Sequence, residues 1–109
     1  MRRLAAYFEG ETHALEGLPV VLHGTSFQLR VWEELRRIPV GDTISYAELA
    51  TRVGNPKARR AVGAANGRNP VAIVVPCHRV VAADGTLWGY GGGLDRKAWL
   101  LRHEGALRA

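Results

Sequence analysis

Residues 45–70 read SYAELATRVGNPKARRAVGAANGRNP, and this stretch decides the fold. Ser45 and Glu48 have the spacing of a capping box, in which a serine and a glutamate three residues later satisfy the first backbone N–H groups of a helix. We expect that helix to end at Gly54, and a second helix to begin at Pro56, a residue that suits a first helical turn. Two short helices joined by a Gly-Asn-Pro turn are typical of a helix-turn-helix.

The segments on either side of residues 45–70 complete a pattern that is α+β and mainly helical. Apolar residues at helical spacing predict a helix over 26–37. Residues 71–75 (VAIVV) are a β-prone run between two prolines and predict a buried strand, and a second short apolar run follows at 80–83. A last helix is expected over 94–105. We therefore expect a winged-helix-like fold with a helix-turn-helix and a short β element.

The chain is expected to hold one functional domain. At 109 residues it is long enough for one modest core and too short for two. Residues 1–24 are interpreted as a lead-in segment, in which Leu4 and Phe8 suggest a short helix before glycine and proline interrupt the pattern. Residues 25–109 then form the domain that carries the function.

The composition is that of a soluble, basic protein. Apolar residues make up 47% and charged residues 23% of the chain, which is ordinary for a globular protein, and the net charge is +5. Such a positive field attracts a polyanion such as nucleic acid, although charge alone favours a merely basic soluble protein equally. No apolar run approaches the roughly 20 residues of a membrane helix, and no export signal is evident. We expect no membrane association and a cytoplasmic location near the nucleoid, or a nuclear one in a eukaryote.

The second helix of the helix-turn-helix mixes basic and small residues. Lys57, Arg59 and Arg60 supply positive charge, and Ala58 and Ala61 are small enough to let the backbone approach a nucleic-acid groove closely. A solvated basic face that packs on the core through its alanines is the alternative reading. The start of this helix carries no Asn or Gln to read adenine, so we expect weak sequence preference.

Cys77 is the only cysteine in the chain. A lone cysteine forms no intramolecular disulfide and no Cys-rich zinc site, and by default it is a small buried hydrophobe. Here it follows a predicted strand and is flanked by His78 and Arg79, a polar environment that is expected to lower its thiol pKa and favour the thiolate. Neighbouring residues on an extended chain point to opposite sides, so we expect His78 to reach Cys77 through a bridging water. The candidate carboxylates to orient this histidine are Glu33, Glu48 and Glu104.

A thiol hydrolase is a second reading of a Cys-His pair, but nothing in the sequence marks an oxyanion hole.

Several further motifs share the order and spacing of one known family. They are Phe27-Gln28 with Val31-Trp32, Ile38-Pro39, Ser45-Tyr46, Arg60-Ala61-Val62, Asn69-Pro70, Pro76-Cys77-His78-Arg79-Val80, Gly89-Tyr90, Gly92-Gly93 and Glu104-Gly105. Together they closely resemble the O6-alkylguanine-DNA alkyltransferases, over about three-quarters of the chain.

The resemblance implies a DNA repair protein that extrudes O6-alkylguanine from the duplex and takes the alkyl group onto its own cysteine in a single, irreversible turnover. It implies that Cys77 is the acceptor, that His78 is the water-linked base, and that Glu104 orients His78. It also implies that Asn69 braces the active-site turn. The implied partner is double-stranded DNA containing O6-alkylguanine, with no cofactor, no metal and a monomeric protein.

The resemblance assigns further residues to the DNA and the base. Arg60 is implied to enter the stack in place of the extruded base, and Tyr46 to turn the target nucleotide. Tyr46 and Tyr90 are implied to donate hydrogen bonds to the base. The backbone carbonyls of Cys77 and Val80 are implied to read the guanine amine, and Gly91 to form a wall of a roomy pocket. The remaining residues expected at the DNA are Lys57, Ala58, Arg59 and Ala61.

Two departures from the family pattern leave alternatives open. Members usually carry an amino-terminal α/β domain, which is expected to be absent here. In length the chain is closer to the alkyltransferase-like proteins, which resemble the same domain, have another residue in place of the acceptor cysteine and bind lesions without repairing them. Cys77 argues against such a non-catalytic sensor. A fragment that folds but neither binds nor reacts is a third possibility.

Overall fold

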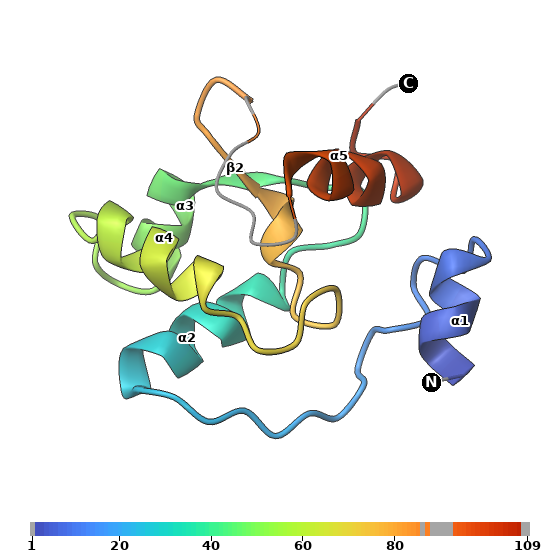
Figure 1. Ribbon diagram of the computed structural model, residues 1–109. Helices are drawn as coiled ribbons and strands as arrows, with labels where there is room; N and C mark the ends of the chain where they lie inside the picture. The colour runs from blue at the N-terminus through green and yellow to red at the C-terminus, as the bar shows by residue number, and fades with distance from the viewer. Residues whose placement is uncertain (1, 86, 88–92, 108–109) are drawn as a thin grey trace.

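Most elements of the chain are helices, and they surround one short helical turn at the centre (Figure 1). The computed structural model describes residues 2–85, 87 and 93–107. The helices in these residues are α1 (Arg2–Phe8), α2 (Ser26–Leu35), α3 (Tyr46–Arg52), α4 (Arg59–Gly67), the 3-10 helix η1 (Cys77–Arg79) and α5 (Leu94–His103). The strands are β1 (Ile44–Ser45) and β2 (Val80–Val81). The predicted α+β, mainly helical fold is confirmed.

Helix α2 begins with a reciprocal pair of side-chain hydrogen bonds. The hydroxyl of Thr25 accepts from the backbone N–H of Gln28 at 3.0 Å, and the side-chain oxygen of Gln28 accepts from the backbone N–H of Thr25 at 3.0 Å. This is a capping box, and it fixes the start of the helix where the sequence predicts it. The buried face carries Val31, Trp32 and Leu35. The helix ends two residues before the predicted end, because the chain then tightens into turns of the 3-10 type.

The predicted helix-turn-helix is formed by α3 and α4, which pack against each other. The hydroxyl of Ser45 accepts a hydrogen bond from the backbone N–H of Glu48 at 3.0 Å and so caps α3 as predicted. The predicted capping box is only half formed, because the Glu48 side chain pairs with Arg52 and does not return to the Ser45 N–H. Gly54 follows α3 with a φ of 87°, a left-handed conformation that glycine adopts without a steric penalty.

The predicted start of the second helix at Pro56 is wrong, because α4 begins at Arg59. The residues before it form a turn, in which the N–H of Ala58 donates to the carbonyl of Asn55 at 3.0 Å. The first helical hydrogen bond then runs from the N–H of Val62 to the carbonyl of Ala58. A proline fits either conformation, since both need a φ near −65°.

The β element consists of two short parallel strands. Ile44 of β1 lies opposite Val80 of β2, and Ser45 lies opposite Val81. Strand β2 therefore covers the first half of the predicted run 80–83. None of the helices in the described residues is long and apolar enough to cross a membrane.

The predicted strand over residues 71–75 is wrong, because this segment is a closed loop. The side-chain nitrogen of Asn69 donates to the carbonyl of Val75 at 2.5 Å, and its side-chain oxygen accepts from the N–H of Val71 at 2.9 Å. These bonds tie the two ends of the segment together, and Ile73 takes a φ of 74° at its tip. Side-chain bonds to the backbone have replaced the pairing of a strand.

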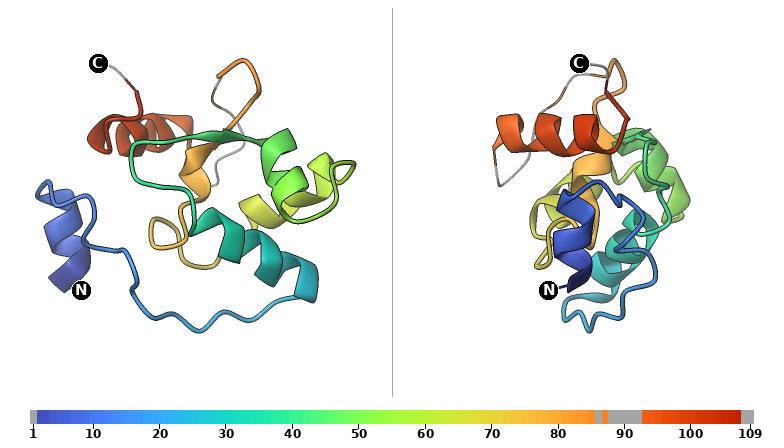
Figure 2. Two further views of the ribbon diagram at one scale, coloured as in Figure 1. Left: turned by 180° about the vertical axis from the view of Figure 1, so that it is seen from behind. Right: turned by 90° about the vertical axis from the view of Figure 1, so that its right-hand side faces the viewer.

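Two apolar clusters explain why the loop is nevertheless apolar. Val75 belongs to the larger cluster, which joins α2, α3, α4 and η1, whereas Ile73 and Val74 pack against a smaller cluster of Tyr7, Leu15 and Leu100. The smaller cluster places α1 beside α5, as both views in Figure 2 show. Residues from the start and the end of the chain therefore share one core.

The capping box makes a prediction about stability. Replacing Thr25 with alanine leaves the first N–H groups of α2 without this acceptor, so Thr25→Ala should lower the free energy of unfolding by about 1 kcal/mol, measured by urea denaturation. Thr51→Ala is the control, because Thr51 lies inside α3, away from its N-terminal cap, where alanine is favoured. Equal losses in the two variants would contradict the assignment of the cap.

Candidate active site

Cys77 is the first residue of η1, at the centre of the fold (Figure 1). It follows the loop closed by Asn69, and its backbone N–H donates to the carbonyl of Val75 at 2.8 Å. The side chain is 6% exposed and packs in the larger apolar cluster. The thiol is free, as expected from the sequence.

A buried network of polar side chains lies beside Cys77. Nε2 of His78 lies 2.9 Å from Oε2 of Glu104, and Arg79 binds both carboxylate oxygens, Nε to Oε1 and Nη2 to Oε2, each at 2.8 Å. The third guanidinium nitrogen, Nη1, donates to the carbonyl of Ile38 at 2.7 Å. Among the three candidate carboxylates, the structure therefore brings Glu104 to the histidine. The other two, Glu33 and Glu48, lie on the surface and pair with Arg37 and Arg52.

The network fixes which nitrogen of His78 carries the proton. Burial by itself would raise the pKa of Glu104, but the hydrogen bonds from Arg79 and His78 outweigh it and lower the pKa to about 2. A carboxylate can only accept, so Nε2 of His78 is the protonated nitrogen. Burial lowers the pKa of His78 despite the attraction of Glu104. His78 is therefore neutral near pH 7, and its buried Nδ1 has no hydrogen-bond partner among the described residues.

The expectation that the surroundings lower the pKa of Cys77 is wrong. Burial raises the pKa of this thiol, and it outweighs the hydrogen bond from Asn69 and the positive charge of Lys97, which lower it. Taking the group out of water disfavours the thiolate more than these neighbours favour it. Cys77 is consequently a thiol at rest, and it needs a base when it reacts.

Lys97 is a residue of the site that the sequence analysis does not single out. It is fully buried in α5, and its Nζ lies 5.9 Å from the ring centre of Tyr46. Burial lowers its pKa to about 8, although a thiolate at Cys77 would raise it. A signal was present, because positions 97, 100, 101 and 104 share one face of a helix and two of them are leucines. That spacing places Lys97 on the buried face.

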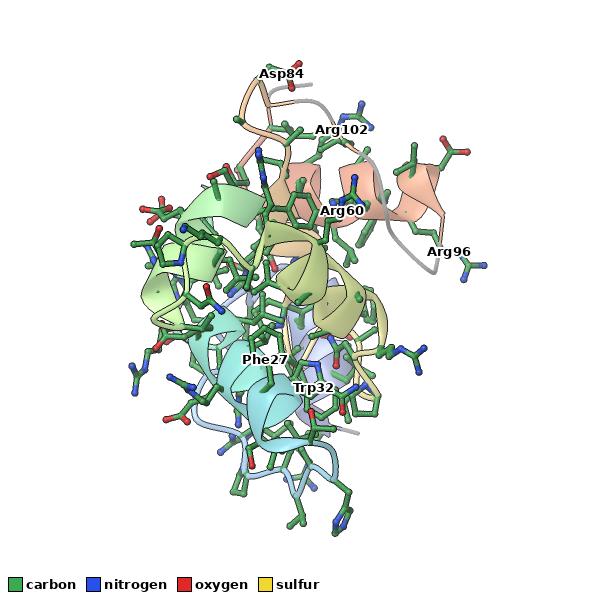
Figure 3. The ribbon with its side chains drawn as sticks, turned by 90° about the vertical axis from the view of Figure 1, so that its left-hand side faces the viewer. Phe27, Trp32, Arg60, Asp84, Arg96 and Arg102 are labelled. Carbon is green, nitrogen blue, oxygen red and sulfur yellow. The ribbon has the colours of Figure 1, made fainter. Side chains whose placement is uncertain are left out.

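Helix α4 presents its basic residues outward and small or apolar ones inward. Arg59, Arg60 and Ala61 are exposed, whereas Val62 and Ala65 are buried. Figure 3 shows Arg60 at the end of α4 nearer to α5, with Trp32 toward the other end. The two neighbours before the helix are Lys57, which is exposed, and Ala58, which is half-buried.

Asn66 on the buried face of α4 is another residue absent from the sequence-based set. Its side-chain nitrogen donates to the carbonyl of Cys77 at 3.3 Å, and its side-chain oxygen is buried with no partner among the described residues. Tyr46 also lies against α4, since a Cβ placed on Gly63 would stand 3.9 Å from its ring. The outer helix and the cysteine are therefore in direct contact.

The structure thus brings His78, Asn69 and Val80 together with Cys77, whereas the predicted DNA-contacting residues lie on or just before α4. Asn69 closes the loop before Cys77, and the N–H of Val80 donates to the carbonyl of Cys77. Tyr90 and Gly91 lie outside the described residues. In the described ranges no group of three His, Cys, Asp or Glu side chains is arranged to hold a metal ion.

Comparison with known proteins identifies the family and the fold. The sequence model of the family "6-O-methylguanine DNA methyltransferase, DNA binding domain" matches residues 26–106. The chain belongs to this family. Within it, the chain is 55% identical over 105 residues to the methylated-DNA--protein-cysteine methyltransferase of Salmonella typhimurium, covering 96% of the chain and 61% of that relative. It therefore spans about three-fifths of that protein's length.

Solved structures related to the 6-O-methylguanine DNA methyltransferase family show the same fold. OGT of Mycobacterium tuberculosis in complex with DNA is 54% identical, with a TM-score of 0.88 over 96% of this chain and 65% of that one. Atl1 of S. pombe, in complex with damaged DNA containing O6-carboxymethylguanine, is 32% identical, with a TM-score of 0.67 over 77% of this chain and 80% of that one.

The buried network predicts loss of stability in acid. The pKa values of His78 and Glu104 are lowered by folding, so each stabilises the fold above its unfolded pKa and loses that contribution as pH falls toward its folded pKa. The free energy of unfolding should begin to fall below about pH 6.5 through His78, and should lose about 3 kcal/mol more from about pH 4.5 to about pH 2 through Glu104. Urea denaturation at a series of pH values measures the free energy of unfolding.

A matched pair of variants separates Glu104 from the other carboxylates. Glu104→Gln should be less stable at pH 7, because Arg79 is left buried without a counter-charge, and it should lack the lower acid limb. Glu48→Gln should keep both acid limbs, because Glu48 is exposed. A wild-type protein whose stability is flat from pH 7 to pH 3 would contradict this account.

Proposed function

We propose that this protein repairs DNA by moving the alkyl group of O6-alkylguanine irreversibly onto Cys77. The observation that carries the proposal is the buried Cys77 next to a neutral His78, whose Nε2 is tied to Glu104 and whose Nδ1 is unpartnered among the described residues. This arrangement supplies a nucleophile and an oriented base without a metal or cofactor. The family to which the chain belongs supports the substrate.

The proposed reaction follows from the protonation states. Cys77 gives its proton to Nδ1 of His78 through a bridging water, and its sulfur attacks the alkyl carbon. The sulfur–carbon bond forms while the bond from carbon to O6 of guanine breaks, and the electron pair of that bond stays on the base. Glu104 remains a carboxylate throughout and stabilises the positive charge that develops on His78. The product is a thioether, so each molecule reacts once.

Further residues of the site are assigned to recognition of the base. The hydroxyl of Tyr46 donates to the extruded base, together with Tyr90, and the carbonyls of Cys77 and Val80 accept from the guanine amine. The contacts of Tyr46 with α4 and Lys97 support this place for the tyrosine. Asn69 holds the loop before Cys77. Glycine at position 91 has no side chain, so we expect larger alkyl groups to be accepted as well.

The exposed face of α4 is the proposed contact with double-stranded DNA. Arg60 enters the base stack in place of the extruded guanine, and Lys57 and Arg59 contact phosphates. Ala58 and Ala61 let the helix approach the groove. The family's DNA-binding domain and the complex of OGT with DNA support this proposal. The protein acts as a monomer, in the cytoplasm near the nucleoid, or in the nucleus of a eukaryote.

The decisive experiment is intact-mass spectrometry after incubation with duplex DNA that contains one O6-methylguanine. The native chain should gain one methylene, about 14 daltons, because attack by sulfur leaves the group on the protein. Cys77→Ala should bind the same DNA and gain nothing.

The same measurement tests the second candidate, a sensor that binds the lesion without reacting. The similarity to Atl1, whose structure holds DNA with an alkylated guanine, is the observation that favours it. Tight binding of lesion DNA by the native chain with no gain in mass would establish the sensor and refute the transferase. A native chain that neither binds the lesion DNA nor gains mass would refute both the transferase and the sensor.

Arg60 should matter for duplex DNA and not for the chemistry itself. Extruding a base costs a few kcal/mol, so Arg60→Ala should slow methyl transfer from duplex DNA at least about tenfold. Its rate with free O6-methylguanine base should be unchanged, because no stack has to be opened. Arg59→Ala is the matched control. Its slower methyl transfer from duplex DNA should approach the native rate as the salt concentration rises, because a phosphate contact is screened by salt. Equal slowing of both reactions in Arg60→Ala would contradict the role.

A further inference from the structure

We propose that Tyr7 of α1 is a positioning residue of the active centre, whose hydroxyl holds Oε2 of Glu104 and thereby keeps His78 a competent base. The proposal rests on the proposed function, since the same site carries both. Tyr7 precedes the family match at residues 26–106, and nothing in the sequence marks it as part of the site. It lies 97 positions from Glu104 along the chain.

The contact between α1 and the carboxylate is direct and buried. The Tyr7 hydroxyl donates to Oε2 of Glu104 at 2.8 Å, and the residue is 1% exposed. The backbone carbonyl of Tyr7 accepts from Nε2 of His103, and the two rings meet edge to face with centroids 5.0 Å apart. His103 in turn stacks on Trp99. Tyr7 is therefore held by α5 at both its backbone and its ring.

The hydroxyl competes with His78 for the charge of Glu104. Within the part of the chain that the structure describes, Oε2 accepts from three donors: Nε2 of His78, Nη2 of Arg79 and the Tyr7 hydroxyl. Each donor draws charge from that oxygen and weakens its attraction for the others. Without the Tyr7 hydroxyl, more of the carboxylate's charge acts on His78, which then holds a proton at higher pH. A protonated His78 cannot accept the proton of Cys77.

The other charged groups around His78 are unchanged by the loss of this hydroxyl. Those that face the pair from the elements packed against it are Arg79 and Cys77 of η1, Lys97 and His103 of α5, and Tyr46 of α3 beside Cys77. Arg36, Arg37 and Glu16 line a cavity that Arg79 also lines. The variant Tyr7→Phe removes one oxygen atom and leaves all of these in place.

The test is the titration of His78 in the full chain labelled with ¹⁵N-histidine. Long-range ¹H–¹⁵N spectra report the tautomer and the pKa of each histidine, and the pH dependence of methyl transfer is recorded in parallel. In the native chain His78 should carry its proton on Nε2. In Tyr7→Phe its pKa, and the acid limb of the rate, should rise by about half a unit to one unit.

Leu15→Ala is the matched control, because Leu15 belongs to the same cluster as Tyr7 and its aliphatic side chain can donate no hydrogen bond to Glu104. Leu15→Ala should lower the melting temperature and leave unchanged both the pKa of His78 and the midpoint of the acid limb of the methyl-transfer rate. If Tyr7→Phe lowers the melting temperature but moves neither midpoint, the proposal is overturned. Native His78 protonated on Nδ1 would overturn it as well, and this result needs no variant. A shifted His78 titration in a chain that takes no methyl group would refute the proposed function and support the role of Tyr7.

Discussion

The structure depends on one buried carboxylate, that of Glu104. A charged group in the interior is costly unless it is paired, and here the guanidinium of Arg79 takes both oxygens. His78 and Tyr7 complete the set of donors, so the end of α5, the turn η1 and helix α1 are joined at a single group. Arg79 extends the connection to the carbonyl of Ile38, just after α2. Loss of the carboxylate would remove the acceptor of Nε2 of His78 and of Nε and Nη2 of Arg79, all of them buried.

The same carboxylate sets the chemistry of the site by being a poor base. Its low pKa keeps it ionised, so it orients His78 and leaves Nδ1 as the atom that can take a proton. Burial keeps Cys77 protonated at rest, with Lys97 close enough to favour the thiolate. In the proposed reaction, Cys77 therefore gives its proton to His78 only as the sulfur attacks. A thiol at rest is protected from premature reaction.

Helix α4 couples the outer face of the molecule to this centre. Its exposed side carries Arg59 and Arg60, whereas on its buried side Asn66 donates to the carbonyl of Cys77 and the carbonyl of Ala65 accepts from the indole of Trp32 at 2.9 Å. One helix therefore carries both the exposed arginines and a side chain that is hydrogen-bonded to the cysteine backbone. The small Ala65 and the side chain of Val62 complete the buried side of the helix.

By itself the sequence determined the features that depend on neighbours in the chain: the helix-turn-helix, the cap at Ser45 and the Pro-Cys-His-Arg motif. Residue spacing left three carboxylates open for His78, and the family resemblance pointed to Glu104. Only the tertiary structure shows that Glu104 meets His78 and that Tyr7 joins it, because these contacts link residues that are 26 and 97 positions apart. The apolar run 71–75 shows the limit most clearly. Its composition is that of a strand, but Asn69 ties its ends into a loop and its side chains divide between two cores, a choice made by packing.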